Sequence, residues 1–195
     1  MSWTLQRRDV VAKLLANRGE DLLVVTGLGQ PTYDAYAAGD DPRTFYLWGA
    51  MGGAVPMGIG MAVAQPDKRS MVITGDGEIL MGLGSLAMAG AEKLGNLAVV
   101  VLDNERYGET GQQKTHTARG VDLEKMAQAS GFVRTMTVTD EAGLAEGVKL
   151  ARTGQGPVFV LIKISDEPVE LVVPPKDATW LKNRFRQAVL GDAGV

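Results

Sequence analysis

The sequence predicts an α/β fold with three layers, α/β/α, around a six-stranded parallel sheet. Six short apolar runs alternate with segments of helical spacing, which is the order of elements in such folds. Most of these runs are unbroken, as expected of strands that helices cover on both faces. Neither an internal repeat nor a low-complexity linker divides residues 1–195. We therefore expect one domain.

The composition is typical of a globular protein and excludes several kinds of site. Apolar residues make up 45% of the chain and charged residues 22%. The net charge of −3 gives no reason to expect nucleic acid or an acidic membrane surface as a partner. Because the sequence has no cysteine, disulfides, thiolate metal sites, an iron–sulfur cluster and a cysteine nucleophile are all excluded.

Two segments bear on membrane targeting. Residues 1–8 lack the apolar core of a signal peptide, so we expect a cytoplasmic protein. The longest uncharged apolar stretch, 47–64, is shorter than the roughly 20 residues of a membrane span, and Pro56 and five glycines weaken it further. We expect no membrane segment.

The first 74 residues predict three helices and three strands in alternation. Ser2 or Thr4 can cap the first helix, and Gly19 suits its end. The small residues of 49–65 suit a helix whose backbone approaches something closely, although tight packing on the sheet explains them equally well. The expected elements are a helix ending near Gly19, strands at 22–26, 44–48 and 70–74, and helices at 33–37 and 49–65.

The rest of the chain predicts three further strands and a long polar loop. Residues 103–120 show no apolar periodicity, and loops of that length in compact domains are usually functional. Asp122, Asp177 and either Thr139 or Asp140 precede apolar residues at helical spacing, as N-caps do. The expected elements are strands at 97–102, 132–138 and 158–164, a helix from Leu80 to Gly95, and helices beginning after the three caps.

Two turns carry polar groups at the ends of neighbouring apolar runs. Gly75-Asp76-Gly77-Glu78 follows one run, and Asp103-Asn104 ends the next. Open α/β sheets bind ligands at the carboxyl ends of their strands. Exposed N–H groups at a helix start bind phosphate, and oxygens from Asp76, Asn104 and a following carbonyl suit Mg²⁺. Gly-Asp-Gly alone is also common turn chemistry.

The spacing of these turns resembles that of thiamine-diphosphate-dependent enzymes. In this sequence 25 residues separate Gly75-Asp76-Gly77 from Asp103-Asn104. The segment 48–52, Trp-Gly-Ala-Met-Gly, is similar to a Gly-Ser-Met-Gly segment of the same family. Residues 45–47, before this segment, and Tyr107 and Thr110, after Asp103-Asn104, most resemble the corresponding residues of phosphonopyruvate and sulfopyruvate decarboxylases. The resemblance covers nearly the whole chain and implies the thiamin-diphosphate-binding fold.

The resemblance implies a metal site and a diphosphate site. Asp76, the Asn104 side chain and the Arg106 carbonyl would ligate Mg²⁺. The backbone N–H groups of Gly77 and Glu78 would face the diphosphate of thiamine diphosphate. Many relatives have a small residue at position 78, so the Glu78 carboxylate adds negative charge; we expect it to point away from the ligand and to favour the helix dipole.

The resemblance also implies contacts to the rest of the cofactor. The Gly49 carbonyl would accept a hydrogen bond from the 4′-amino group, and Met51 would hold the cofactor bent so that its imino nitrogen reaches C2. Without Gly49 beside it, Met51 would be interpreted as a residue that only packs in the core. The same resemblance places Ala50, Gly75, Tyr107 and Gly108 at the cofactor.

Three residues of the polar loop are candidates for catalysis. His116 is the only histidine and is suited to proton transfer near neutral pH, although a lone histidine in a loop is more often solvent-exposed. Glu109 and Thr110 belong to the same loop, which would lie over the cofactor.

The family's chemistry needs a carboxylic acid that faces N1′ of the aminopyrimidine, and this acid comes from a separate pyrimidine-binding domain. Six strands leave no room for that domain in 195 residues, so we expect an α subunit that supplies the glutamate, in an α₂β₂ or higher assembly. The expected reaction is decarboxylation of a small 2-oxo acid. A carboligase or oxidoreductase subunit is the alternative within this chemistry. A nucleotide- or phosphate-binding Rossmann-like module, using the Gly27-Leu28-Gly29 turn, is the alternative outside it.

Overall fold

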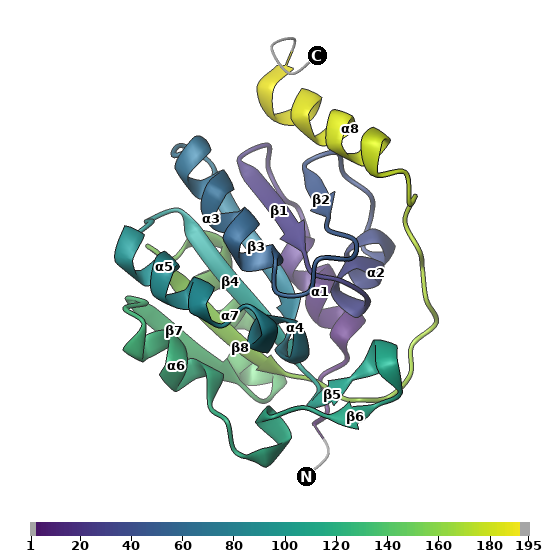
Figure 1. Cartoon of the computed structure of the whole chain (residues 1–195), viewed down its shortest axis with the longest axis vertical. Helices are drawn as coiled ribbons and strands as arrows, with labels where there is room; N and C mark the ends of the chain where they lie inside the picture. The colour runs from purple at the N-terminus through teal and green to yellow at the C-terminus, as the bar shows by residue number, and fades with distance from the viewer. Residues whose placement is uncertain (1–2, 192–195) are drawn as a thin grey trace.

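The computed structural model describes residues 3–191 and contains a parallel sheet of six strands (Figure 1). All five neighbouring strand pairs run parallel, which confirms the predicted α/β fold. In spatial order, the strands are β2 (Thr44–Tyr46), β1 (Leu22–Thr26), β3 (Arg69–Gly75), β4 (Leu97–Asp103), β8 (Val158–Lys163) and β7 (Arg134–Val138).

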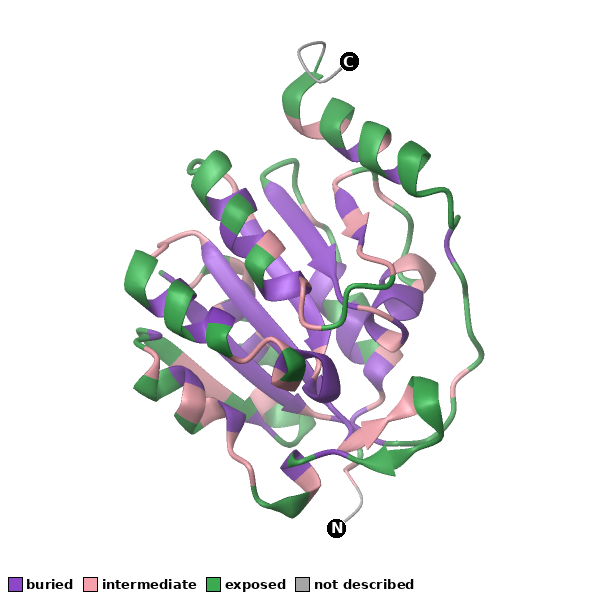
Figure 2. Cartoon of the chain, in the orientation of Figure 1, coloured by how far each residue is buried: buried purple, intermediate pink, exposed green. Residues whose placement is uncertain are grey.

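Helices cover both faces of this sheet, and each face has its own apolar core. The strands β1, β3, β4 and β8 are buried along nearly their whole length (Figure 2), because alternate apolar residues enter the two cores. In the edge strand β7 only Val138 is buried. On one face lie α1 (Arg7–Leu15), α2 (Gln30–Ala37) and α7 (Glu141–Thr153). On the other lie α3 (Ala54–Ala64), α4 (Asp76–Met81), α5 (Gly84–Glu92) and α6 (Leu123–Ala129).

The last helix, α8 (Ala178–Leu190), packs beside the edge strand β2 (Figure 1). The ring of Phe185 meets that of Phe45 edge-on, with centroids 5.5 Å apart. Residues 164–177 reach α8 from β8 without helix or strand and pass the loop after β4, where Arg106 Nε pairs with Asp166 Oδ2 at 3.2 Å. Among residues 3–191, no helix has the length and apolar character to cross a membrane.

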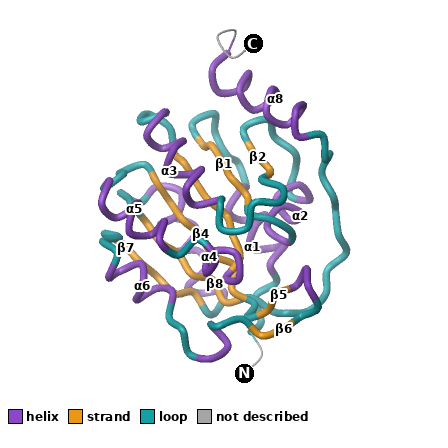
Figure 3. The backbone as a smooth tube through the Cα atoms, viewed as in Figure 1, coloured by secondary structure: helices purple, strands orange, loops and turns teal. Residues whose placement is uncertain are grey.

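The predicted polar loop 103–120 holds short elements of its own (Figure 3). An antiparallel pair, β5 (Arg106–Tyr107) and β6 (Gln113–Lys114), encloses the 3₁₀ turn η1 (Gly108–Thr110). A second turn, η2 (Thr117–Arg119), leads towards α6.

Three predicted helices are too long. The first ends at Leu15 and not near Gly19, and a close contact between glycines explains the other two errors. The helix expected at 49–65 begins only at Ala54, because Gly49 and Gly52 have φ of 74° and 83°. The helix expected from Leu80 to Gly95 is instead α4 and α5, broken at Gly82. A Cβ on Gly82 would lie 2.3 Å from the Gly52 carbonyl oxygen, so only glycine lets these backbones meet.

The predicted caps and strand ends differ in a few places. Asp122, Asp140 and Asp177 each cap a helix by accepting a backbone N–H, as predicted. Thr4 does not cap α1, whose N-cap is Gln6, and Ser2 lies outside the described residues. The strand expected at 44–48 ends at Tyr46, and the one expected at 132–138 begins at Arg134.

The order of connections defines where this sheet can bind a ligand. From β1 the chain moves outward through α2 to β2, and then returns past β1 through α3 to β3. The loops therefore leave β1 and β3 in opposite directions, which opens a crevice at their carboxyl ends.

Candidate functional site

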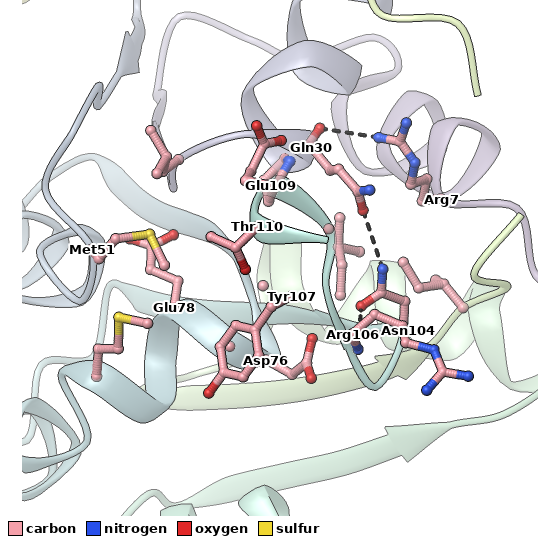
Figure 4. A pocket seen from close by; sticks show the side chains of 18 residues that line it. Arg7, Gln30, Met51, Asp76, Glu78, Asn104, Arg106, Tyr107, Glu109 and Thr110 are labelled. Atoms are coloured by element: carbon pink, nitrogen blue, oxygen red, sulfur yellow. Dashed lines mark hydrogen bonds between the residues drawn. The ribbon is translucent and has the colours of Figure 1, made fainter. Parts of the chain in front are cut away.

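A cavity of about 420 Å³ lies at the carboxyl ends of β1, β3 and β4 (Figure 4). Its wall comes from six parts of the chain that are far apart in sequence: the start of α1, the turn after β1, the loop before α3, the segment from the end of β3 to the end of α4, the segment from the end of β4 to η1, and the residue after β8. The lining residues are Arg7, Leu28, Gln30, Pro31, Met51, Gly75, Asp76, Gly77, Glu78, Met81, Leu102, Asn104, Arg106, Tyr107, Gly108, Glu109, Thr110 and Ile164.

Most of the residues singled out from the sequence line this one cavity. They are Met51, Gly75, Asp76, Gly77, Glu78, Asn104, Arg106, Tyr107, Gly108, Glu109 and Thr110. Gly49, Ala50 and His116 are not lining residues. The His116 side chain is exposed, and its carbonyl accepts the N–H groups of Arg119 and Val121, so the structure gives His116 a place in a turn and leaves its catalytic role a prediction.

Asp76 is the first residue of α4 and is 1% exposed. Its Oδ2 accepts hydrogen bonds from Thr115 Oγ1 at 2.5 Å and Thr117 Oγ1 at 3.1 Å. Burial, and after it the charge of Asp103, raise the pKa of the Asp76 carboxyl from 3.8 to about 7. A cation in the cavity would favour the ionised form.

Asn104 occupies a tight bend at the end of β4. Its Oδ1 accepts the Arg106 N–H at 3.0 Å, and its Nδ2 donates to Gln30 Oε1 at 3.3 Å. Asp103 Oδ1 accepts the N–H of Glu105, which has a left-handed φ of 61°. These two side chains hold the bend, and Asn104 lines the cavity together with Asp76.

The Glu78 carboxyl is buried, and Oε2, the oxygen that accepts a hydrogen bond, lies between the ends of β1 and β3. Oε2 accepts a hydrogen bond from Thr74 Oγ1 at 2.8 Å, and a Cβ on Gly27 would lie 1.6 Å from that oxygen. Burial raises the pKa of Glu78; the Thr74 hydroxyl and three backbone N–H groups facing the carboxyl oppose this shift. None of these N–H groups makes a hydrogen bond of regular geometry to Oε1. The Glu78 carboxylate thus occupies part of the crevice at the carboxyl ends of β1 and β3.

Gly77 and Met51 also have defined surroundings. A Cβ on Gly77 would lie 2.5 Å from the Tyr107 ring, so glycine is needed where that ring packs over the start of α4. Met51 is 41% exposed and lines the cavity, so core packing, the alternative for this residue, does not describe its position.

Several lining residues were missed from the sequence. Leu28, Gln30 and Pro31 follow β1 at the same sheet edge as Gly75, and the Gly-rich turn after that apolar run was the signal that could have identified them. Arg7 gave no signal in the sequence. It is 3% exposed, and its Nη1 lies 2.5 Å from Asp34 Oδ2, inside α2.

The polar groups of the cavity fit a hard cation that a diphosphate shares. Within residues 3–191, no group of three His, Cys, Asp or Glu side chains could hold a metal alone. Mg²⁺ is commonly bound by one or two carboxylates together with phosphate oxygens and water. Asp76 Oδ1 makes no hydrogen bond of regular geometry with a residue in this range, and Asn104 Oδ1 has one lone pair left. The residues present therefore suit a Mg²⁺–diphosphate group.

Comparison with protein families gives a match over most of the chain. Residues 27–162 match the family described as thiamine pyrophosphate enzyme, C-terminal TPP binding domain. The chain is 35% identical to sulfopyruvate decarboxylase subunit beta of Methanocaldococcus jannaschii, over 94% of this chain and 97% of that one.

A longer relative and a solved structure agree with this match. Phosphonopyruvate decarboxylase of Streptomyces viridochromogenes is 36% identical over 94% of this chain but only 46% of its own length. The thiamine diphosphate-dependent 4-hydroxybenzoylformate decarboxylase of Rhodococcus jostii RHA1 has the same fold, with a TM-score of 0.70 at 20% identity, over 86% of this chain and 34% of that one.

Proposed function

This chain belongs to the thiamine pyrophosphate (thiamine diphosphate) enzymes, and on that premise we propose that it is the β subunit of a thiamine-diphosphate-dependent decarboxylase that acts on a small 2-oxo acid. Relatives that carry the names sulfopyruvate decarboxylase and phosphonopyruvate decarboxylase match over nearly the whole of this chain. The observation that carries the proposal is the convergence of Asp76 and Asn104, from the ends of adjacent strands, on one cavity at the switch point of the sheet.

In the proposed site, Asp76, the Asn104 side chain and the Arg106 carbonyl hold Mg²⁺. The N–H groups of Gly77 and Glu78, at the start of α4, face the diphosphate. When bound, thiamine diphosphate supplies the nucleophile for the keto carbon and the electron sink for decarboxylation. The residues of this chain bind and orient that group.

Gly49 and Met51 are proposed to fix the other end of the cofactor. They lie in one glycine-rich loop before α3, and the Gly52–Gly82 backbone contact ties this loop to the end of α4. Glu109 and Thr110 line the cavity from the β5–β6 hairpin, where they are proposed to face the substrate.

We propose further that a second polypeptide completes the site. The M. jannaschii relative, which this chain matches over 97% of its length, is named a subunit. The S. viridochromogenes relative, whose name carries no subunit designation, is about twice as long as the matched part. The second chain would bind the pyrimidine and supply the activating glutamate, in an α₂β₂ or higher assembly.

Cofactor binding by the full chain tests the proposal. We expect retention of thiamine diphosphate that depends on Mg²⁺ and is lost in Asp76→Ala, measured by equilibrium dialysis. Asp122→Ala, which removes a helix cap and an exposed ion pair with Lys125, is the control and should retain the cofactor. Binding of NAD in place of thiamine diphosphate would refute the proposal and favour a dinucleotide-binding module.

A further inference from the structure

Two threonine hydroxyls lie between two buried carboxylates beside the cavity. Thr115 Oγ1 and Thr117 Oγ1 are 2.8 Å apart, and both contact Asp76 Oδ2, at 2.5 and 3.1 Å. Thr117 Oγ1 also lies 2.9 Å from Asp103 Oδ1. None of these four side chains is more than 7% exposed, so water does not compete for the hydroxyls. Neither threonine lines the cavity itself.

The hydroxyls determine which oxygen of Asp76 faces a metal. Thr115 donates to Oδ2, and the Thr117 hydroxyl, whose single proton is donated either to Asp76 Oδ2 or to Asp103 Oδ1, lies on the same side of the carboxyl. Oδ1 makes no hydrogen bond of regular geometry with the described residues. A carboxylate whose second oxygen is hydrogen-bonded is fixed in orientation, and such outer contacts tune metal affinity. Thr115 and Thr117 therefore leave Oδ1 as the oxygen available for coordination.

Thr117 also connects Asp76 to the second ligand turn. Asp103, which Thr117 contacts, accepts the Glu105 N–H and so holds the bend that presents Asn104 and the Arg106 carbonyl. Asp103 Oδ2 lies 2.7 Å from Lys163 Nζ, at the end of β8, and this cation fixes the other side of Asp103. The Thr117 hydroxyl thus lies between the Asp76 carboxylate, at the end of β3, and the Asp103 carboxylate, at the end of β4.

We propose that Thr115 and Thr117 are positioning residues for the Mg²⁺ of this site, and that the segment 115–117 sets the spacing between the Asp76 turn and the Asn104 turn. The inference rests on the proposed function, because it assigns these hydroxyls to the same metal. It adds that the loop carrying Glu109 and Thr110 is attached through its far end to the metal ligand. The loop and the metal are then expected to order together.

The test is calorimetric titration of the full chain with Mn²⁺ in the presence of thiamine diphosphate. Thr117→Val and Thr115→Val keep the side-chain shape and remove the hydroxyl, and we expect Mn²⁺ affinity to fall about 10–100-fold. Thr117→Ser and Thr115→Ser keep the hydroxyl and should bind within about threefold of the unmodified chain, on the same reasoning. Thr137→Val is the matched control, because Thr137, on β7 away from the cavity, also donates to a carboxylate, that of Glu124 in α6. The Mn²⁺ affinity of this variant should not change.

The outcomes separate a positioning role from a purely structural one. If a folded valine variant melts at a lower temperature yet binds Mn²⁺ as tightly as the unmodified chain, the hydroxyls only satisfy buried carboxylates and the inference is wrong. Should both valine variants fail to fold, a tenfold loss of affinity in the serine variants would overturn it. If the unmodified chain binds no Mn²⁺ with thiamine diphosphate even when its copurifying partner is present, the proposed function fails and this inference fails with it.

Discussion

Replacing Asp76 by asparagine should stabilise the metal-free chain while abolishing metal binding. The carboxyl is buried, and its pKa is raised from 3.8 to about 7. A difference of one between the pKa values of the folded and unfolded states corresponds to about 1.4 kcal/mol. Ionisation of Asp76 therefore lowers the free energy of unfolding by about 4 kcal/mol. The asparagine side chain would be similar in shape, carry no charge and still accept a threonine hydroxyl. We expect Asp76→Asn to be more stable than the unmodified chain at pH 8 by up to that amount.

The sign of the pH dependence follows from proton binding. Because the folded state holds the Asp76 proton more tightly than the unfolded state, stability falls as pH rises. The loss begins near pH 4, grows to about pH 7 and is constant above it. The stability difference between Asp76→Asn and the unmodified chain should therefore be about 3 kcal/mol smaller at pH 5 than at pH 8.

Urea unfolding with a chelator, at pH 5 and pH 8, measures this difference. Addition of Mg²⁺ and thiamine diphosphate should reverse the order of stability, because only the unmodified chain gains binding free energy. Two results would refute the reasoning: a metal-free Asp76→Asn chain that is less stable at pH 8, or a difference that is the same at both pH values.

Three further perturbations test neighbouring parts of the structure. Gly27→Ala should lower the free energy of unfolding by about 1–3 kcal/mol, because the new Cβ would meet the Glu78 carboxyl. In a Glu78→Ala background the same substitution should lower it by less than about 1 kcal/mol. Additive effects of the two substitutions on urea unfolding would contradict the contact. Arg7→Met should destabilise by about 3 kcal/mol, because Asp34 is fully buried, whereas Arg8→Met, which removes a partly exposed partner of Asp34, should cost under about 1 kcal/mol; equal effects on thermal unfolding would argue against this assignment. Met51→Ala should lower kcat for CO₂ release at least about tenfold and leave Mg²⁺–pyrophosphate binding unchanged, and unchanged kcat would remove Met51 from the positioning of the cofactor.

The sheet could be predicted from the sequence because each strand is a local pattern. The run 97–102, which is buried on both faces of the sheet, is recognisably apolar without any knowledge of its neighbours. The helix boundaries at 49–53 and Gly82 could not be predicted. They depend on a backbone contact between Gly52 and Gly82, which are far apart in sequence, and a run of small residues does not reveal its partner.

Some residues at the cavity could likewise be predicted from the sequence, and others could not. Asp76 and Asn104 were found because each lies where an apolar run ends, and parallel strands bring such ends to one edge. Thr115 and Thr117 lie in a polar loop without periodicity, and only the folded β5–β6 hairpin brings them against Asp76. Arg7 reaches the cavity from α1 through its pairing with Asp34, which no local pattern indicates.

In the proposed assembly, this chain holds the Mg²⁺–diphosphate part of a site that a second chain completes. The most direct measurement is CO₂ release from sulfopyruvate, phosphonopyruvate and pyruvate, with thiamine diphosphate and Mg²⁺, by the full chain alone, by its copurifying partner alone, and by the two together. We expect decarboxylation of at least one of these acids only by the combined chains, and its loss in Asp76→Ala. Decarboxylation at an enzyme-like rate by this chain alone would contradict the claim.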